Sequence, residues 1–229
     1  MIKAYILLSK RLDISDQAFS QHWLEVHAPL ALRLKKLHRY VQSHCLADPV
    51  PEFPQNQEWS GFAEVWMDTL EDLQGIPEDP DYLGGLYLDE PNFINRDKTR
   101  YLFTREHEIV KPPALIDCKT DLIKSVYLTR RLPGLSVEEF QAHWLETHAL
   151  LVPKTPGLLG YTQSHTAAEC YQDAEPYYDG VAELWWPDLE TFIQAWNSEQ
   201  HKSEQLNDLA SFVDLENTVG MLVRPHHIL

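Results

Sequence analysis

The sequence predicts an α+β fold in which two ferredoxin-like β-α-β-β-α-β repeats share one chain. The first observation is an internal duplication: residues 3–44 align without gaps on residues 124–165, and sixteen of these 42 positions are identical. The second is a further match between residues 61–66 and 180–185. The third is that short apolar strand-like segments alternate with helical ones in both halves.

The duplication is densest in two clusters, whose copies lie 121 positions further along the chain. The first cluster is His-Trp-Leu-Glu, followed one residue later by His-Ala; the second is Tyr-x-Gln-Ser-His. They occupy residues 22–28 and 40–44, with copies at 143–149 and 161–165. The tails align at an offset of 119, so the two repeats extend over both halves.

The strands can be predicted twice, because each repeat gives an independent example of the same pattern. Short runs rich in β-forming residues recur at matched positions, and side chains two apart share a face. The predicted strands are 3–9, 39–45, 61–67 and 99–105, with copies at 124–130, 160–166, 180–186 and 218–224.

The helices follow from capping signals and from helical spacing of apolar residues. Ser136 and Glu139 form a Ser-x-x-Glu capping box, and Ser15 begins the matching helix of the first repeat. A second helix is expected at Thr69–Gly75, with a better-formed copy at Leu189–Asn197.

The domain organisation follows from the repeats. We expect a first repeat at 1–110, a linker at 111–121 that contains a Lys-Pro-Pro segment, and a second repeat at 122–229. A four-stranded sheet with helices on one face leaves its other face apolar, so two such sheets in one chain would pack face to face. Two independent domains are the alternative.

Composition limits the partners. Thirty-five acidic residues against nineteen basic ones give a formal charge of −16, which argues against binding to nucleic acid or to membrane surfaces. No apolar run reaches the roughly 18 residues of a membrane span, and no signal-peptide pattern opens the chain. The three cysteines fit a reducing compartment, so the expected location is cytoplasmic.

The helix and strand motifs resemble the EthD family. The resemblance rests on an aromatic residue, a His-Trp pair, His-Ala-Pro-Leu and a strand that ends in Tyr-x-Gln-x-His. In the first repeat these are Phe19, His22-Trp23, His27–Leu30 and Tyr40–His44, whereas in the second Leu150 stands in place of the proline. The resemblance covers both halves and implies a dimeric α/β-barrel, here formed within one chain.

Three functions are implied by this resemblance. The first is a cofactor-independent oxygenase or cyclase/isomerase that acts on a small aromatic or polyketide-like compound; such an enzyme would need no cofactor and no metal. The second is a haem-binding barrel with a helix histidine as axial ligand. The third is a non-catalytic carrier of small hydrophobic ligands or an accessory protein. The fused chain would be a monomer or form a homodimer through its helices.

The helix histidines are the first site candidates. His22 and His27 are five residues apart, so on an α-helix they would point about 140° away from each other and would not share a metal. His27 lies four residues after Trp23, shares its face and is expected to point toward the sheet. A neutral imidazole there can act as a general base; alternatively, its ring bonds a backbone carbonyl and joins helix to strand.

The strands supply the other candidates. Tyr40, Gln42 and His44 share one face of their strand, and Glu64 shares a face of the next strand with Phe62 and Trp66. If these faces coincide, His27 or His44 is the base, Tyr40 and Glu64 assist, and Trp23, Gln42, Phe62 and Trp66 contact the substrate. The alternative is a structural hydrogen-bond set repeated in His165 and Glu183. Pro29 and the bulkier Trp185-Trp186 pair favour a working site in the first half.

Overall fold

The computed structural model describes residues 1–46, 50, 51, 53, 58–114, 122–172 and 174–229. Within these residues there are eight strands: β1 (Ile2–Leu8), β2 (Arg39–Cys45), β3 (Gly61–Met67), β4 (Arg100–Val110), β5 (Ile123–Thr129), β6 (Gly160–Thr166), β7 (Gly180–Trp186) and β8 (Val219–His227). They form a closed antiparallel barrel in the order β1-β3-β2-β8-β5-β7-β6-β4. The predicted α+β class and duplicated barrel are therefore confirmed.

The predicted strand ends agree with the observed ones to within one residue, with two exceptions. β4 continues to Val110, beyond the predicted end at residue 105, and β8 continues to His227. The predicted linker of 111–121 therefore follows a longer strand than expected, and its residues 115–121 lie outside the described residues.

The helices are α1 (Asp16–His22), α2 (Ala28–Ala31), α3 (Leu70–Gln74), α4 (Tyr87–Asp89), α5 (Val137–Glu146), α6 (Leu189–Trp196) and α7 (Leu206–Phe212). Both predicted caps form: Ser15 Oγ accepts from the Ala18 amide, and Ser136 and Glu139 bond reciprocally. In the described part of the chain, π-helical turns, in which hydrogen bonds span five residues, occupy Trp23–His27, Tyr82–Leu86 and Gln200–Gln205. Within the described residues no helix is both long and apolar enough to cross a membrane.

The chain divides into two compact units. The first comprises residues 1–47, 57–103 and 225–229, and the second comprises 48–56 and 104–224. β4 and β8 therefore each begin in one unit and end in the other. The repeats at 1–110 and 122–229 remain a prediction of the domain boundaries. The compact units differ from them, because residues 225–229 belong to the first unit and residues 104–110 to the second.

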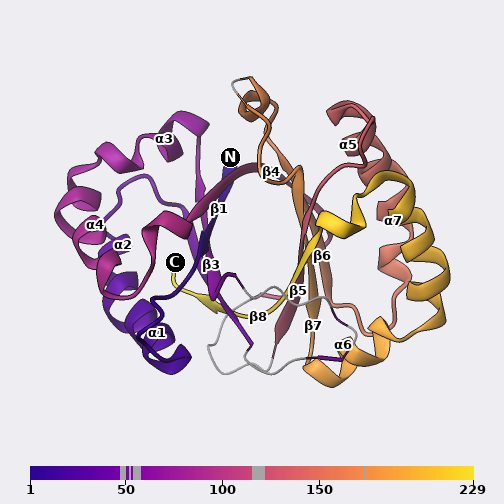
Figure 1. The fold of residues 1–229 in the computed structure, drawn as a ribbon, viewed down its shortest axis with the longest axis horizontal. Helices are drawn as coiled ribbons and strands as arrows, with labels where there is room; N and C mark the ends of the chain where they lie inside the picture. The colour runs from indigo at the N-terminus through magenta and orange to yellow at the C-terminus, as the bar shows by residue number, and fades with distance from the viewer. Residues whose placement is uncertain (47–49, 52, 54–57, 115–121, 173) are drawn as a thin grey trace. The chain divides into compact units, whose positions relative to one another are not determined.

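In the first unit, helices α1 to α4 lie along one face of strands β1 and β3 (Figure 1). The core between them is aromatic: Phe19 lies 5.4 Å from Trp23 and 5.8 Å from Phe93, measured between ring centroids. All three side chains are buried. Burial of large rings is the dominant favourable contribution to folding, so this cluster fixes the helices against the sheet.

The opposite face of the first unit's sheet carries a buried ion pair. Lys3 Nζ lies 2.9 Å from Glu64 Oε2, and both side chains are almost fully buried. The ammonium also lies 4.6 Å from the centre of the Trp66 ring. The second unit repeats the pair as Lys124 and Glu183. A buried charge is tolerated only with such a partner.

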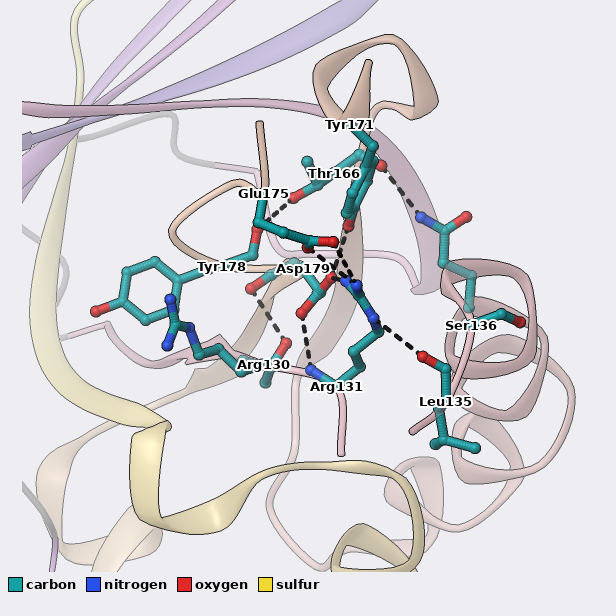
Figure 2. Close-up of polar contacts among 12 residues, drawn as sticks. Arg130, Arg131, Leu135, Ser136, Thr166, Tyr171, Glu175, Tyr178 and Asp179 are labelled. Atoms are coloured by element: carbon teal, nitrogen blue, oxygen red, sulfur yellow. Dashed lines mark hydrogen bonds and ion pairs between the residues drawn. The ribbon is translucent and has the colours of Figure 1, made fainter. Parts of the chain in front are cut away.

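The second unit has an arginine-centred network at the start of its helical segment. Figure 2 shows the Arg131 guanidinium between the carboxylates of Asp179 and Glu175. Arg131 Nη2 donates to both Glu175 oxygens at 2.9 Å. The Arg131 amide donates to Asp179 Oδ2 at 2.8 Å, and Nε donates to the Leu135 carbonyl at 3.1 Å. Tyr171 donates its hydroxyl to Asp179 at 2.8 Å. This network ties the loop before β7 to the loop before α5.

Candidate functional site

A cavity of about 390 Å³ lies in the first unit, between its helices and the helix-facing side of its sheet. This volume falls in the range of small-molecule sites. Most of its wall is aliphatic or aromatic, contributed by β1, β3, α2, α3 and the segment from residue 76 to 94. The lining residues that carry polar side-chain groups are Trp23, His27, Tyr40, Gln74, Tyr82, Tyr87, Glu90, Arg96, Thr99 and Tyr101.

His27 is placed at this cavity by a carboxylate. His27 Nδ1 lies 2.9 Å from Asp89 Oδ2, and Asp89 is buried. The carboxylate accepts a hydrogen bond, so Nδ1 carries the proton and Nε2 keeps its lone pair. Among the described residues Nε2 has no hydrogen-bond partner, and His27 lines the cavity. This arrangement suits a general base.

The second helix histidine binds the same carboxylate. His22 Nε2 lies 2.8 Å from Asp89 Oδ1, and Asn92 donates to that oxygen at 3.1 Å. The expectation that His22 and His27 point about 140° apart is therefore wrong. The reason is the π-helical turn, in which the Ala28 amide donates to the Trp23 carbonyl. A π-turn holds more residues than an α-turn, so positions five apart come to one side.

The environment keeps this base neutral. Burial is the largest effect on His27 and lowers its pKa, although the hydrogen bond and charge of Asp89 act in the opposite direction. Burial alone would raise the pKa of Asp89, but hydrogen bonds from His27, Asn92 and His22 hold it below its usual range. At neutral pH the pair is therefore an imidazole beside a carboxylate, ready to accept a proton at Nε2.

Tyr40 supplies the complementary donor. Its hydroxyl oxygen accepts hydrogen bonds from Trp23 Nε1 at 3.1 Å and from Gln42 Nε2 at 2.9 Å. Both nitrogens are donors only, so the phenolic proton remains available. No described residue accepts it, and Tyr40 lines the cavity. Burial raises the pKa of Tyr40 to about 12, so the proton stays on the oxygen at neutral pH.

His44 and Gln42 stand behind Tyr40 and are absent from the described cavity wall. His44 stacks on Trp23, with ring centroids 4.4 Å apart, and its Nε2 lies 3.1 Å from Gln42 Oε1. Its Nδ1 is 2.6 Å from Ser20 Oγ. Burial lowers the pKa of His44 to about 3, so it is neutral and both ring nitrogens are bonded. His44 therefore orients Gln42, which in turn orients Tyr40.

The two strand faces considered in the sequence analysis do not coincide. Residues directly opposite in an antiparallel pair share a face, and the register sets Tyr40 opposite Val65 and His44 opposite Gly61. Glu64 therefore lies on the other side of the sheet, where it accepts from Ser43 Oγ at 2.7 Å and pairs with Lys3. Phe62 and Trp66 share that side. None of Phe62, Glu64 and Trp66 lines the described cavity, whereas Trp23, His27 and Tyr40 do.

The second unit contains the same machinery around a cavity of about 330 Å³. His148 Nδ1 lies 2.8 Å from Asp208 Oδ2, and His143 Nε2 lies 3.0 Å from Asp208 Oδ1. Tyr161 accepts from Trp144 Nε1 at 3.1 Å and from Gln163 Nε2 at 2.8 Å. Both halves therefore hold an open pocket. Trp186 lines the second pocket, whereas Trp185 does not.

Asp89 is a candidate site residue that the sequence pattern did not predict. It lies in α4, in a stretch where no element was predicted, and its partners are more than 60 positions earlier in the chain. The signal was present in the repeat: Asp89 and Asp208 align at the offset of 119. A carboxylate kept in both copies beside the other matched residues would have identified it.

The described residues can be compared with what a bound metal ion and a bound haem would each require. Among the described residues no group of three His, Cys, Asp or Glu side chains is placed to hold a metal ion. An Asp-backed imidazole with an unbonded Nε2 would suit a haem iron. The rest of the donor set does not fit haem, because its two propionates need cations. Among the described residues that line the first cavity, Arg96 is the sole lysine or arginine, and it is bonded to Glu90. The described residues that line the second cavity include neither lysine nor arginine.

Comparison with solved structures supports the fold. An anthrone oxidase-like protein is 7% identical, with 99% of this chain and 93% of that chain covered and a TM-score of 0.68. A "Putative monooxygenase" from Fusobacterium nucleatum is 7% identical, covering 98% and 91%, with a TM-score of 0.62. Mutant chlorite dismutase from Candidatus Nitrospira defluvii is 11% identical, covering 97% and 90%, with a TM-score of 0.52. At these identities the likeness shows the fold alone.

A search of curated proteins finds no match to the sequence. The family model described as the EthD domain matches twice, at residues 11–97 and 132–216. These two matches contain both His-Trp clusters, both Tyr-x-Gln-Ser-His strands and both carboxylates that hold the histidines. The chain therefore belongs to the EthD family and carries its domain in tandem.

Proposed function

We propose that each cavity is an active site for proton abstraction from an activated carbon acid, such as a small aromatic or polyketide-like ketone. The observation that carries the proposal is the Asp89–His27 pair. His27, whose Nε2 has no hydrogen-bond partner among the described residues, lines the same cavity as Tyr40, whose hydroxyl proton also has none. A base and a hydrogen-bond donor facing one apolar space are the two groups that enolisation requires.

The proposed step uses this chain's own groups. His27 Nε2 takes a proton from the carbon next to a carbonyl, and the electron pair of the broken C–H bond moves onto the carbonyl oxygen. Tyr40 donates its hydroxyl proton in a hydrogen bond to that developing negative charge, without transferring it. The charge on the new imidazolium is balanced by Asp89. The apolar wall strengthens both interactions because it excludes water.

The enolate can lead to each of the reactions that the family resemblance implies. Reprotonation at another carbon completes an isomerisation, and attack on a second carbonyl of the same molecule closes a ring. With dioxygen as the electron acceptor, the carbon that lost the proton is oxidised to a carbonyl: one oxygen atom of O₂ enters the new C=O bond and the other leaves as water with the two hydrogens of the methylene. The protein then acts as a cofactor-independent oxygenase. The neighbours named for monooxygenase and anthrone oxidase activity make the last course worth testing first.

Anthrone is a suitable probe, since it is a tricyclic carbon acid whose methylene group is acidified by its ring carbonyl. We would measure deuterium uptake at this methylene from D₂O by NMR without oxygen, and then oxygen consumption with an electrode. The wild-type chain is expected to accelerate the exchange. Oxygen uptake above the uncatalysed rate would identify the oxygenase course, and its absence with exchange intact would identify isomerase or cyclase chemistry.

The variants take account of the duplication. His27→Gln and His148→Gln each remove the base of one cavity, and we expect only the double variant to lose the whole acceleration, by about 10²-fold or more. Unchanged exchange in a folded double variant would overturn the proposal. A barrel that only carries ligands would bind anthrone without accelerating exchange. A haem protein would develop a Soret band on titration with haem, which His27→Gln would weaken and the double variant would abolish.

A further inference from the structure

The two cavities share their base and their phenol but differ at one wall. At the offset of 119, Tyr82, Glu90 and Arg96 of the first cavity correspond to His201, Leu209 and Leu215 of the second. All six side chains line their respective cavities. A charged, hydrogen-bonded wall in one half is therefore replaced by an imidazole and two leucines in the other.

The wall of the first cavity offers an unused donor. Arg96 Nε donates to Glu90 Oε2 at 2.6 Å, and the Tyr82 hydroxyl donates to Glu90 Oε1 at 3.0 Å. The guanidinium lies 3.9 Å above the Tyr87 ring, which fixes its plane. Among the described residues, Arg96 Nη2 and Thr99 Oγ1 are buried and have no hydrogen-bond partner. Buried donors without acceptors are rare and costly, and they are expected where a ligand binds.

The charge on this wall is balanced. Glu90 neutralises Arg96, so the wall presents a hydrogen-bond donor without net charge. An anionic ligand would also meet the nearby Glu90 carboxylate and the strongly acidic chain, which carries a formal charge of −16. A neutral acceptor such as a ketone or quinone oxygen satisfies Arg96 Nη2 without that repulsion.

The wall of the second cavity offers an unused acceptor. Gln205 Nε2 donates to Thr155 Oγ1 at 2.7 Å, which leaves its amide oxygen facing His201 Nδ1 at 3.0 Å. Nδ1 therefore carries the ring proton, and Nε2 has the lone pair. Among the described residues this Nε2 is buried and has no partner. The ring packs against Trp196 in a tilted arrangement, with 4.5 Å between the ring centroids.

We infer that the two cavities select opposite hydrogen-bonding partners: the first takes a carbonyl-bearing aromatic through Arg96, and the second takes a hydroxyl-bearing aromatic through His201. The inference rests on the same cavities as the proposed function but concerns recognition alone. The two ligand types differ by one functional group, so the fused chain handles related molecules of two kinds rather than one molecule twice.

The experiment measures binding with three tricyclic probes of matched size: 9-fluorenone carries an acceptor, 2-hydroxyfluorene carries a donor, and fluorene carries neither. Dissociation constants come from quenching of tryptophan fluorescence. Arg96→Met keeps the length of the side chain, and His201→Phe keeps the ring. We expect Arg96→Met to weaken 9-fluorenone about ten-fold and leave 2-hydroxyfluorene unchanged, with the reverse for His201→Phe.

Two cavity-filling variants assign each probe to its site. Ala63→Phe and Ala182→Phe occupy matched positions on the two walls, so each should abolish one binding event if its melting temperature is close to that of the wild type. Should either filled chain fail to fold, the Arg96 and His201 variants still decide the question. Equal weakening of both probes by either variant, or no preference over fluorene, would overturn the inference.

The outcome is independent of turnover. If anthrone exchange is absent but the two probe preferences follow Arg96 and His201, the catalytic proposal fails and the recognition inference stands. If exchange is present and both cavities bind all three probes alike, the recognition inference fails alone.

Discussion

His27 Nδ1 lies 2.9 Å from Asp89 Oδ2, and this contact decides which ring nitrogen faces the cavity. A carboxylate that accepts from Nδ1 fixes both the tautomer and the orientation of the imidazole. The matching contact in the second half, from His148 Nδ1 to Asp208 Oδ2, is 2.8 Å. Two short contacts thus define both candidate active sites.

The pH dependence of proton abstraction should report this pair. Burial lowers the pKa of His27 below 6.5, so the base is unprotonated above that pH and exchange reaches a plateau there. As the pH falls through the folded pKa, the imidazole is protonated and the rate declines. In a His148→Gln background, Asp89→Asn should move this decline to lower pH, because the carboxylate favours the imidazolium. A decline at the same pH in both chains would contradict the assignment.

Removal of the Tyr40 hydroxyl should affect catalysis and stability separately. Tyr40→Phe, in the same His148→Gln background, should lower the exchange rate about 10- to 100-fold, because the developing negative charge loses its donor. The same change leaves Trp23 Nε1 without its acceptor, which should cost about 1–3 kcal/mol in the free energy of unfolding. Tyr161→Phe is the matched control, since it should give the stability loss without a further loss of rate in this background.

The buried strand histidines should make the fold sensitive to acid. Burial lowers the pKa of His44 and of His165 to about 3. In the unfolded chain each protonates near pH 6.5, whereas in the folded chain each stays neutral. Their contribution to stability is therefore complete above pH 6.5 and falls, by on the order of 1 kcal/mol per pH unit for each histidine, as the pH drops below 6.5.

Urea unfolding at pH 7, 6 and 5 checks this prediction. His44→Phe keeps a ring against Trp23 and removes the titrating group, so its stability should fall less steeply with decreasing pH than that of the wild type. His165→Phe should behave in the same way, since His165 stacks on Trp144. Parallel pH dependence in wild type and variants would show that these histidines do not stay neutral in the folded chain.

The arginine network of Figure 2 should stabilise the second unit more than its counterpart stabilises the first. Arg131→Met removes the ion pairs to Asp179 and Glu175 and leaves a buried carboxylate, so we expect a loss of about 2–4 kcal/mol. At the matched position, Lys10 Nζ has two polar side-chain contacts among the described residues: it lies 3.4 Å from the exposed Asp16 carboxylate and donates to the Ile14 carbonyl. Lys10→Met should therefore cost less than about 1 kcal/mol, measured by urea unfolding.

Local signals made most of the fold predictable. Ser15 and Ser136 cap their helices as expected, because capping depends on residues three positions apart. The register between β2 and β3 was not predictable, since it depends on packing across the sheet. A difference of one residue in register decides the face of a side chain, and the observed register places Glu64 on the sheet face opposite Tyr40 and His44. The π-turn at Trp23–His27 was also missed, because side-chain spacing does not distinguish it from an α-helix.

Part of the candidate site was predictable because its motifs recur in both repeats. Trp23, His27 and Tyr40 lie in motifs that recur in both repeats, and all three line the first cavity. Arg96 and His201 occur at positions where the repeats differ, so a search for matched residues passes over them. Sequence repetition therefore pointed to the shared chemistry, whereas the differences in recognition required the cavities themselves.

Strands β4 and β8 each contribute residues to both compact units, so neither repeat, cut out at the sequence boundaries, contains all the residues of one unit. A fragment with residues 1–114 would lack Pro225–Leu229, whose backbone bonds to Tyr40 on β2 through Ile228 and Leu229. Its partner fragment, 122–229, would lack Thr104–Val110, which pair with β6. When co-expressed, the two fragments could therefore be used for fragment complementation, because each needs residues of the other and recovery of the fold would report their association.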